Sequence, residues 1–327
     1  MIALFKQKSP ANIAVLFIFG LLLKLPAFLY QKKVIVSQID GRLYQWLISL
    51  LPSNSTSAYS IIAFLLLYIQ SLMINYLINE YRMMAKVTYL PAMAYLLITS
   101  ILPEWNHLSS PLVANTLIIW MFIYLFRLYN SGHAKAQVYN IGLITGICSY
   151  IYFPSAAFII CFLVGLMILK PFRINEMILF FLGCLTLYYF HGVYLFLFSK
   201  LNFANFFPKV SIKVPAIKSS IWLAGSILLL TIPFLIGGYY LQANMRRMLI
   251  QVRKNWSVLL VYLLLAFFIP FINSDQSFHT WVLITVPFAA FHASAYFYPA
   301  KRFFPLILFF ITMGYILYQQ YGTLTWQ

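Results

Sequence analysis

Five acidic residues occur in this chain of 327 residues, and their positions limit where it could do acid–base or metal chemistry. Asp40, Glu104 and Asp275 each lie in a short polar segment between long apolar stretches. A carboxylate in such a place can act as a general base or help to hold a divalent metal ion. Asp40 and Glu104 are therefore the candidate catalytic residues, and the candidate metal ligands if a metal is bound; no other cofactor is indicated.

Basic and imidazole groups near these acids could bind an anion. Arg42 follows Asp40 by two positions, and His279 follows Asp275 by four, so that Asp275 and His279 could share one helix face. An imidazole can bind phosphate or donate a proton. Lysines gather without an acid in the segment 199–218, and clustered lysines favour anionic groups such as a lipid-linked phosphate. The candidate phosphate-binding residues are Arg42, Asp275, His279, Lys209 and Lys213.

Each candidate also has a structural alternative. Asp40 could make a turn with Gly41, and Glu104 could end a helix within an aromatic belt. Asp275 could cap the helix that follows it, because an Asp near a helix start accepts unpaired backbone N–H groups. The lysines could contact lipid headgroups, and Lys24 could extend from the first apolar stretch to the membrane surface.

The elements that must position these residues are membrane-spanning helices. Hydrophobic residues make up 63% of the chain and charged residues 8%, and the mean hydropathy is +0.87. Apolar stretches of about 18 residues or more can cross the hydrocarbon layer as helices, which satisfy their own backbone hydrogen bonds. The sequence predicts an all-α, polytopic helical membrane protein with one transmembrane domain over residues 1–327. Its eleven predicted spans are 11–30, 58–79, 87–103, 109–128, 138–152, 154–170, 175–198, 219–241, 256–273, 278–297 and 303–320.

Charge asymmetry predicts the orientation of these spans. The fifth and sixth meet at Pro154, either as a tight hairpin of short helices or as one bent helix. The hairpin places 14 basic residues on the side of the N-terminus and seven on the other side, as the positive-inside rule requires. We therefore predict an inner N-terminus and an outer C-terminus, with Asp40, Glu104 and Asp275 at the outer face.

Two predicted outer segments are longer than a connection needs. The first, about 31–57, carries Asp40 and a run rich in Tyr, Trp and Leu that suits a short helix lying in the membrane interface. The second is the basic segment, about 199–218.

Several functions are disfavoured by missing motifs. The sequence has no Walker A, GxGxxG, HExxH or GxSxG motif, which disfavours ATP-driven transport, dinucleotide chemistry and zincin proteolysis. The net charge of +17 is explained by lysines and arginines at helix ends, so no nucleic-acid partner is expected. His191 and His292, within predicted spans, are expected to be hydrogen-bonded packing residues.

The late segment that begins Phe278-His279-Thr280-Trp281 and reaches Pro287 before small residues resembles a helix found in many GT-C integral membrane glycosyltransferases. The acid in a long first outer loop and the many short-looped helices are similar too. The whole chain also looks like a bacterial membrane-protein family of similar length related to that superfamily.

The resemblance implies transfer of a sugar from a polyprenyl-phosphate donor at the outer face of the bacterial inner membrane. Asp40 would be the general base or metal-associated carboxylate, and Glu104 a second, assisting acid. His279 and the lysines would hold the lipid phosphate. The chain departs from the pattern in two ways. It has one acid in the first outer loop, where relatives often have two, and it lacks the sizeable outer domain that many members use for acceptors.

Two other classes of function stay open. The chain could be a non-catalytic subunit or scaffold on the same fold, with membrane protein partners. It could also be a lipid or solute transporter, although transporters tend to place ionisable groups near the bilayer midplane and to show repeats. In all three cases membrane lipids surround it.

Overall fold

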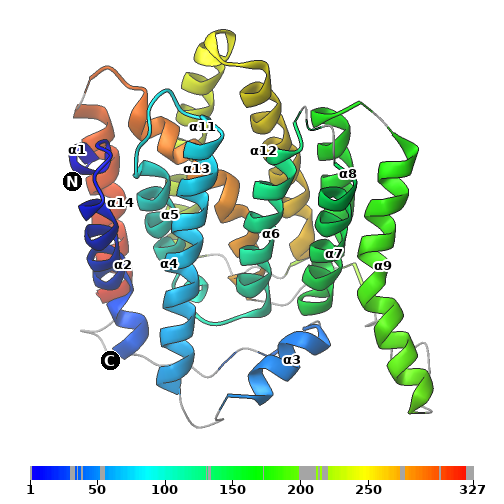
Figure 1. The fold of residues 1–327 in the computed structure, drawn as a ribbon. Coiled ribbons are helices and arrows are strands. Elements are labelled where there is room, and N and C mark those ends of the chain that lie inside the picture. Colours follow the sequence, from blue (N-terminus) through cyan, green and yellow to red (C-terminus); the bar gives the residue numbers. More distant parts are fainter. Residues whose placement is uncertain are drawn as a thin grey trace.

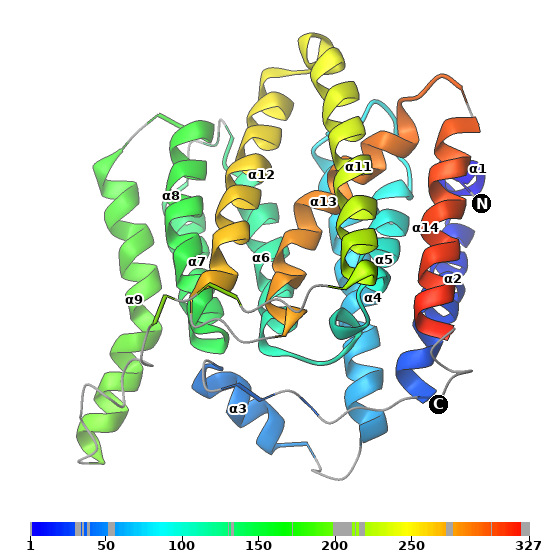
Figure 2. The same ribbon diagram turned by 180° about the vertical axis from the view of Figure 1, so that it is seen from behind.

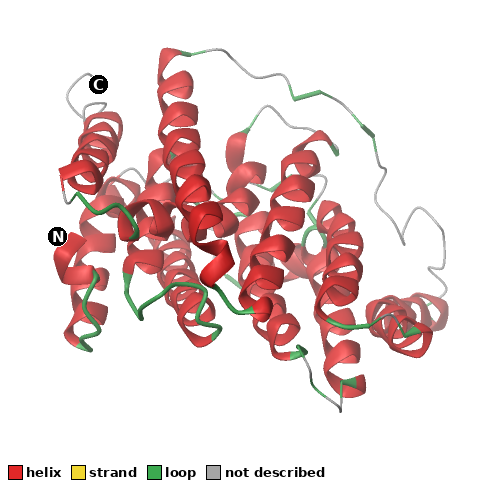
Figure 3. Cartoon of the chain, turned by 90° about the horizontal axis from the view of Figure 1, so that it is seen from above, coloured by secondary structure: helices red, strands yellow, loops and turns green. Residues whose placement is uncertain are grey.

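The computed structural model describes residues 2–29, 34, 36–37, 40–51, 56–129, 131, 134–171, 173–198, 211–212, 214–215, 220–272, 277–301 and 303–321. Helices and the loops between them make up this part of the chain, as Figure 3 shows along the helix axes. The all-α fold class is therefore confirmed.

The helices run side by side in a bundle (Figures 1 and 2). In chain order the α-helices are α1 (Ile2–Phe5), α2 (Ala11–Leu29), α3 (Arg42–Ser49), α4 (Thr56–Glu80), α5 (Leu90–Ile101), α6 (Ser110–Arg127), α7 (Lys135–Ile151), α8 (Phe158–Leu169), α9 (Ile174–Leu197), α11 (Ile221–Asn244), α12 (Ile250–Phe268), α13 (Thr285–Phe297) and α14 (Phe303–Tyr321). Short 3-10 helices lie between them: η1 (Pro103–Asn106), η2 (Phe153–Ala157), η3 (Met245–Arg247), η4 (Ile269–Phe271) and η5 (Phe278–Ile284).

Helices lie at all eleven predicted spans. Eight of the described helical stretches are long and apolar enough to cross a membrane: those of α2, α4, α6, α9, α11, α12, η5–α13 and α14. The other three, α5, α7 and η2–α8, are shorter. The chain is thus a multi-pass helical membrane protein.

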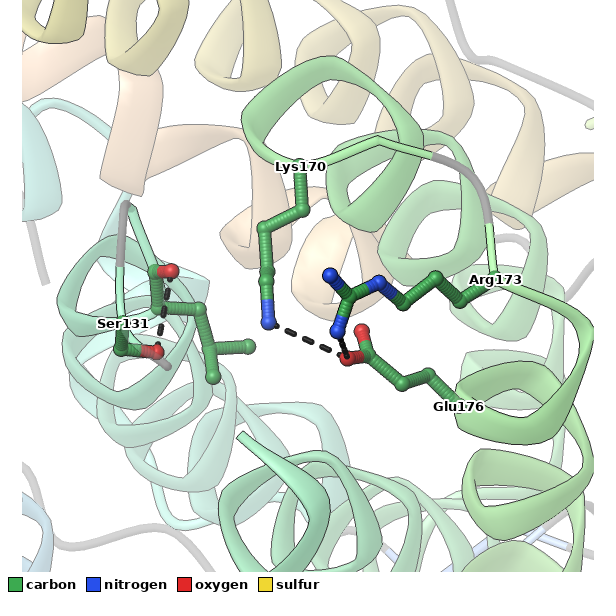
Figure 4. Close-up of polar contacts among 5 residues, drawn as sticks. Ser131, Lys170, Arg173 and Glu176 are labelled. Atoms are coloured by element: carbon green, nitrogen blue, oxygen red, sulfur yellow. Dashed lines mark hydrogen bonds and ion pairs between the residues drawn. The ribbon is translucent and has the colours of Figure 1, made fainter. Parts of the chain in front are cut away.

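The break at Pro154 is a hairpin. α7 ends at Ile151, Tyr152 adopts an extended backbone, and Pro154 lies in the first turn of η2, where a missing N–H costs no helical hydrogen bond. α8 then returns, because Lys170 at its end and Ser131 before the start of α7 lie at the same end of the bundle (Figure 4).

A network of uncharged polar side chains holds the centre of the bundle together. Gln70 of α4 donates to the Leu112 carbonyl (2.8 Å) and accepts a hydrogen bond from the Tyr95 hydroxyl of α5. Asn115 of α6 donates to that hydroxyl (3.1 Å) and reaches the Thr285 hydroxyl of α13 (3.5 Å). These side chains are fully buried, and every residue of α5 is buried with them.

Glycines allow α7 and α9 to touch backbone to backbone. A Cβ on Gly142 would lie 2.1 Å from the Phe180 carbonyl oxygen, and one on Gly146 would lie 2.5 Å from that of Cys184. Gly183 makes the reciprocal approach from α9 to Tyr139. This spacing of small residues every four positions is the usual way in which membrane helices pack closely.

An ion pair joins the end of α8 to the start of α9, at the opposite end of the bundle from α3. Lys170 and Glu176 are buried and 3.2 Å apart, and the exposed Arg173 lies 3.9 Å from the same carboxylate oxygen (Figure 4). Glu176 lies in the first turn of α9, where a negative charge also complements the helix dipole. The short connection between α8 and α9 is therefore held at both ends.

We expect Gly142→Ala to destabilise the protein, by about 1–3 kcal/mol, because its new methyl group must push α9 away from α7. Thermal unfolding in detergent measures the effect. Gly314→Ala in α14 is the matched control, since its Cβ would meet no atom within 4 Å, and it should change stability by no more than about 1 kcal/mol. Equal effects of the two substitutions would contradict the packing argument.

Candidate functional site

The candidate residues that the structure describes gather at one end of the bundle, which we call the α3 face. α3 lies across this end, beneath α6 and α7 and beside the start of α4 (Figures 1 and 2). Its entry is fixed by Gly41, whose N–H donates to the Ile151 carbonyl at the end of α7 (2.8 Å). A Cβ at Gly41 would lie 1.9 Å from the Tyr150 carbonyl oxygen, so only glycine fits this approach.

Asp40 is a buried carboxylate with two described donors. One oxygen accepts the Ser37 backbone N–H (2.7 Å), and the other accepts the hydroxyl of Ser110, the first residue of α6. The whole residue is 7% exposed to solvent. The backbone of Asp40 also forms a bridge with Tyr152, so that α3, α6 and the α7–α8 hairpin all fix its position.

Tyr44 is the third residue of α3 and follows Asp40 by four positions, about one helical turn. It is 1% exposed, and its hydroxyl has no hydrogen-bond partner among the described residues. Burial raises the pKa of the phenol, and the charges of Asp40 and Tyr59 raise it further. The phenol is therefore protonated throughout the physiological range and offers a hydrogen to an acceptor.

Arg42 points toward α9. Its guanidinium Nη1 lies 3.2 Å from Nε2 of His191, and the imidazole lies edge-on to the Tyr150 ring at 5.3 Å between centroids. Because a guanidinium only donates, Nε2 accepts and the imidazole proton is on Nδ1. His191 is thus a packing residue, as predicted, that also orients Arg42, whose exposed guanidinium has further N–H groups to offer an anion.

Glu104 holds the start of the late helix. Its Oε2 accepts the backbone N–H of Phe278 (2.5 Å), and the Trp105 indole donates to the carbonyl of the same residue (2.9 Å). Phe278 is the first residue of η5, so its N–H has no partner within the helix. A carboxylate from η1 therefore caps η5 from a distant part of the sequence.

His279 follows in η5 and is buried, with Nδ1 2.5 Å from the Ser277 hydroxyl. The structure thus brings Glu104 and His279 to one junction of η1 and η5. The same connection between α5 and α6 carries Glu104 and, six residues later, the Ser110 that bonds Asp40. One short segment therefore contributes both to the Glu104–His279 junction and to the Asp40 site.

Lys24 departs from its predicted place at the membrane surface. It is 1% exposed, and its ammonium nitrogen donates to Asn106 Oδ1 (2.6 Å) and Thr99 Oγ1 (3.0 Å). The prediction of a side chain extending to the surface is wrong, because Thr99 of α5 and Asn106 of η1 supply acceptors inside the bundle. His292 fits its prediction, with Nε2 2.8 Å from the Leu230 carbonyl oxygen.

Asp275, Lys209 and Lys213 lie outside the described residues. Within the part of the chain that is described, no group of three or more His, Cys, Asp or Glu side chains could hold a metal ion.

Two residues of the site are not apparent from the sequence alone. From the sequence, Tyr44 is one of several interfacial aromatic residues and Ser110 is a serine at a helix start. Only the structure shows that Ser110 bonds Asp40 and that Tyr44, near it in α3, is buried with an unpaired hydroxyl. The polar residues within the spans do indicate contacts between helices. Gln70 and Asn115 are costly in lipid, so each must have a hydrogen-bond partner on another helix.

No family model, curated protein or solved structure matches this chain.

We expect Glu104→Ala to destabilise the protein by about 1–3 kcal/mol, because the Phe278 N–H loses its acceptor. Chemical unfolding in detergent, followed by tryptophan fluorescence, measures the change. Glu80→Ala is the control: this exposed acid ends α4 at the opposite end of the bundle, and its loss should change stability by less than about 0.5 kcal/mol. A Glu104→Ala protein as stable as wild type would refute the cap.

Proposed function

We propose that the chain is a GT-C-like membrane protein that transfers a sugar from a polyprenyl-phosphate donor at the outer face of the bacterial inner membrane. The observation that carries the proposal is the buried Asp40 carboxylate, which Ser110 and the Ser37 N–H orient at the α3 face. A carboxylate fixed in this way suits a general base, whose rate depends on correct orientation toward the proton it removes.

In the proposed reaction, Asp40 accepts the proton of an acceptor hydroxyl. The hydroxyl oxygen then attacks the anomeric carbon of the donor sugar, and the bond from that carbon to the phosphate oxygen breaks. Polyprenyl phosphate leaves with the electron pair of that bond. The acceptor gains the sugar, and the proton held by Asp40 is released to water.

The leaving phosphate needs cations near its negative charge. Arg42 supplies one at the start of α3, and His191 orients it. Lys209, Lys213, Asp275 and His279 complete the proposed phosphate-binding set. Glu104 bonds Phe278 through Oε2, which leaves Oε1 as the oxygen that could assist. Asp40 and Glu104 are the proposed ligands of a divalent metal, but these two carboxylates lie on separate segments and no third His, Cys, Asp or Glu of the described residues joins them, so the proposed reaction uses no metal.

The proposed orientation has the α3 face outside. α2 begins at the opposite end of the bundle and α14 ends at the α3 face, as an odd number of crossings requires (Figures 1 and 2). Eleven crossings with the N-terminus inside would also keep the larger group of basic residues inside.

One observation favours a second candidate, a non-catalytic GT-C-fold subunit that recruits membrane protein partners. Glu104 caps η5 and His279 is buried, so two of the candidate site residues already have a structural role. In that case the α3 face is a structural surface and not a reaction centre.

Asp40→Asn tests the transferase. The amide keeps the shape of the side chain but cannot accept the acceptor proton, so transfer to outer-face glycan should fall by about 10²- to 10⁴-fold. Radiolabelled polyprenyl-phosphate sugar in membrane vesicles measures the transfer. Glu80→Gln, at the opposite face, should keep wild-type activity.

Wild-type transfer by Asp40→Asn would remove this carboxylate from the mechanism. A stable protein partner that co-purifies equally with a variant changed at Asp40, Glu104 and Asp275 together, with no transfer by the wild type, would favour the scaffold.

Single-cysteine labelling tests the orientation. The three native cysteines are buried, which gives a low background. Ser49→Cys, on the exposed side of α3, should react with a membrane-impermeant maleimide in intact spheroplasts. Lys8→Cys, exposed beside α1, should react only after lysis. The reverse pattern would invert the proposed orientation.

A further inference from the structure

The Tyr44 hydroxyl is a buried donor without an acceptor. It is 1% exposed and has no partner among the described residues, whereas the Asp40 carboxylate, four positions earlier, accepts from Ser37 and Ser110. Buried polar groups are almost always hydrogen-bonded, so an unpaired one requires a reason. A site that waits for a ligand is such a reason.

We propose that Tyr44 is a ligand-binding residue of the Asp40 site, and that its hydroxyl and the Asp40 carboxylate together bind one hydroxyl group of a sugar or related polyol. This inference rests on the proposed function, because it names the groups that hold the acceptor. A ligand hydroxyl has one hydrogen to donate and lone pairs to accept with. It would donate to Asp40 and accept from Tyr44, which satisfies both partners at once.

The charges at the site favour a neutral ligand group. The Asp40 carboxylate would repel a phosphate placed between it and Tyr44, since two negative charges a few ångströms apart oppose each other. Burial and the Asp40 charge also raise the pKa of Tyr44, so the phenol acts there as a donor. The phosphate of a donor lipid would instead lie toward Arg42, which points to α9.

A ligand would enter the proposed site through α3. Asp40 and Tyr44 lie one turn apart across the start of this helix, which has eight residues. Trp46, Leu47 and Leu50 present exposed apolar side chains, and Gly41 holds the start of α3 through its bond to Ile151. A small displacement of α3 about Gly41 would uncover both groups together.

Tyr44→Phe removes one oxygen atom and tests the inference. The full-length protein in lipid nanodiscs is titrated with methyl glycosides of glucose, galactose and mannose, and binding is followed by saturation-transfer NMR. The glycoside that binds wild type best should bind the variant about tenfold more weakly. The unfolding temperature should stay the same or rise, because the deleted hydroxyl had no partner.

Tyr95→Phe is the matched control. It removes a phenol oxygen that is bonded to Gln70 and Asn115, so it should lower the unfolding temperature and leave glycoside binding unchanged. Unchanged binding by Tyr44→Phe, or no glycoside binding by wild type, would overturn the inference.

The transfer assay separates this inference from the proposed function. Normal transfer by Tyr44→Phe, with Asp40→Asn inactive, would sink the role of Tyr44 and keep the transferase. Weakened glycoside binding by Tyr44→Phe, with no transfer by wild type, would keep the hydroxyl-binding pocket and sink the transferase.

Discussion

The buried polar network of Gln70, Tyr95, Asn115 and Thr285 is the constraint on which the bundle depends. Lipid tails are as apolar as leucine, so membrane helices gain little from hydrophobic burial against each other. Hydrogen bonds between uncharged side chains and close contacts between small residues must supply the specificity. The network joins α4, α5, α6 and α13, and the fully buried α5 lies among them.

The position of the candidate site follows from that network. Because α5 and α6 are fixed to α4 and α13, the connection between them must cross the α3 face at a defined place. That connection carries Glu104 to Phe278 and Ser110 to Asp40. Lys24 adds a third attachment through Asn106. The segment from η1 to Ser110 is thus fixed by the core, and through Ser110 it fixes the position of Asp40.

The start of α3 separates opposite charges. Asp40 faces Ser110, whereas Arg42 faces His191 on α9. A sugar transfer from a phosphate donor needs such a division, because the acceptor must lose a proton while the leaving group keeps a negative charge. α9, which carries His191, is held in place by glycine contacts with α7 and by the Lys170–Glu176 ion pair at the far end of the bundle. This division of charge is the geometric basis of the proposed reaction centre at the α3 face.

The sequence by itself determined the class of protein and the helical segments, because hydropathy and length are local properties. The hairpin at Pro154 was predicted from the distribution of basic residues along the chain, since the proline alone allowed a bent helix as well. It also singled out Asp40 and Arg42, since few ionisable groups occur in the chain. It could not assign partners. Glu104 meets Phe278 across 174 positions and Arg42 meets His191 across 149. Whether Lys24 reaches water or Tyr44 finds an acceptor depends on how each helix is rotated and on what packs against it. Only the tertiary structure decided these contacts, because they are set by packing between segments that carry no mark of each other in the sequence.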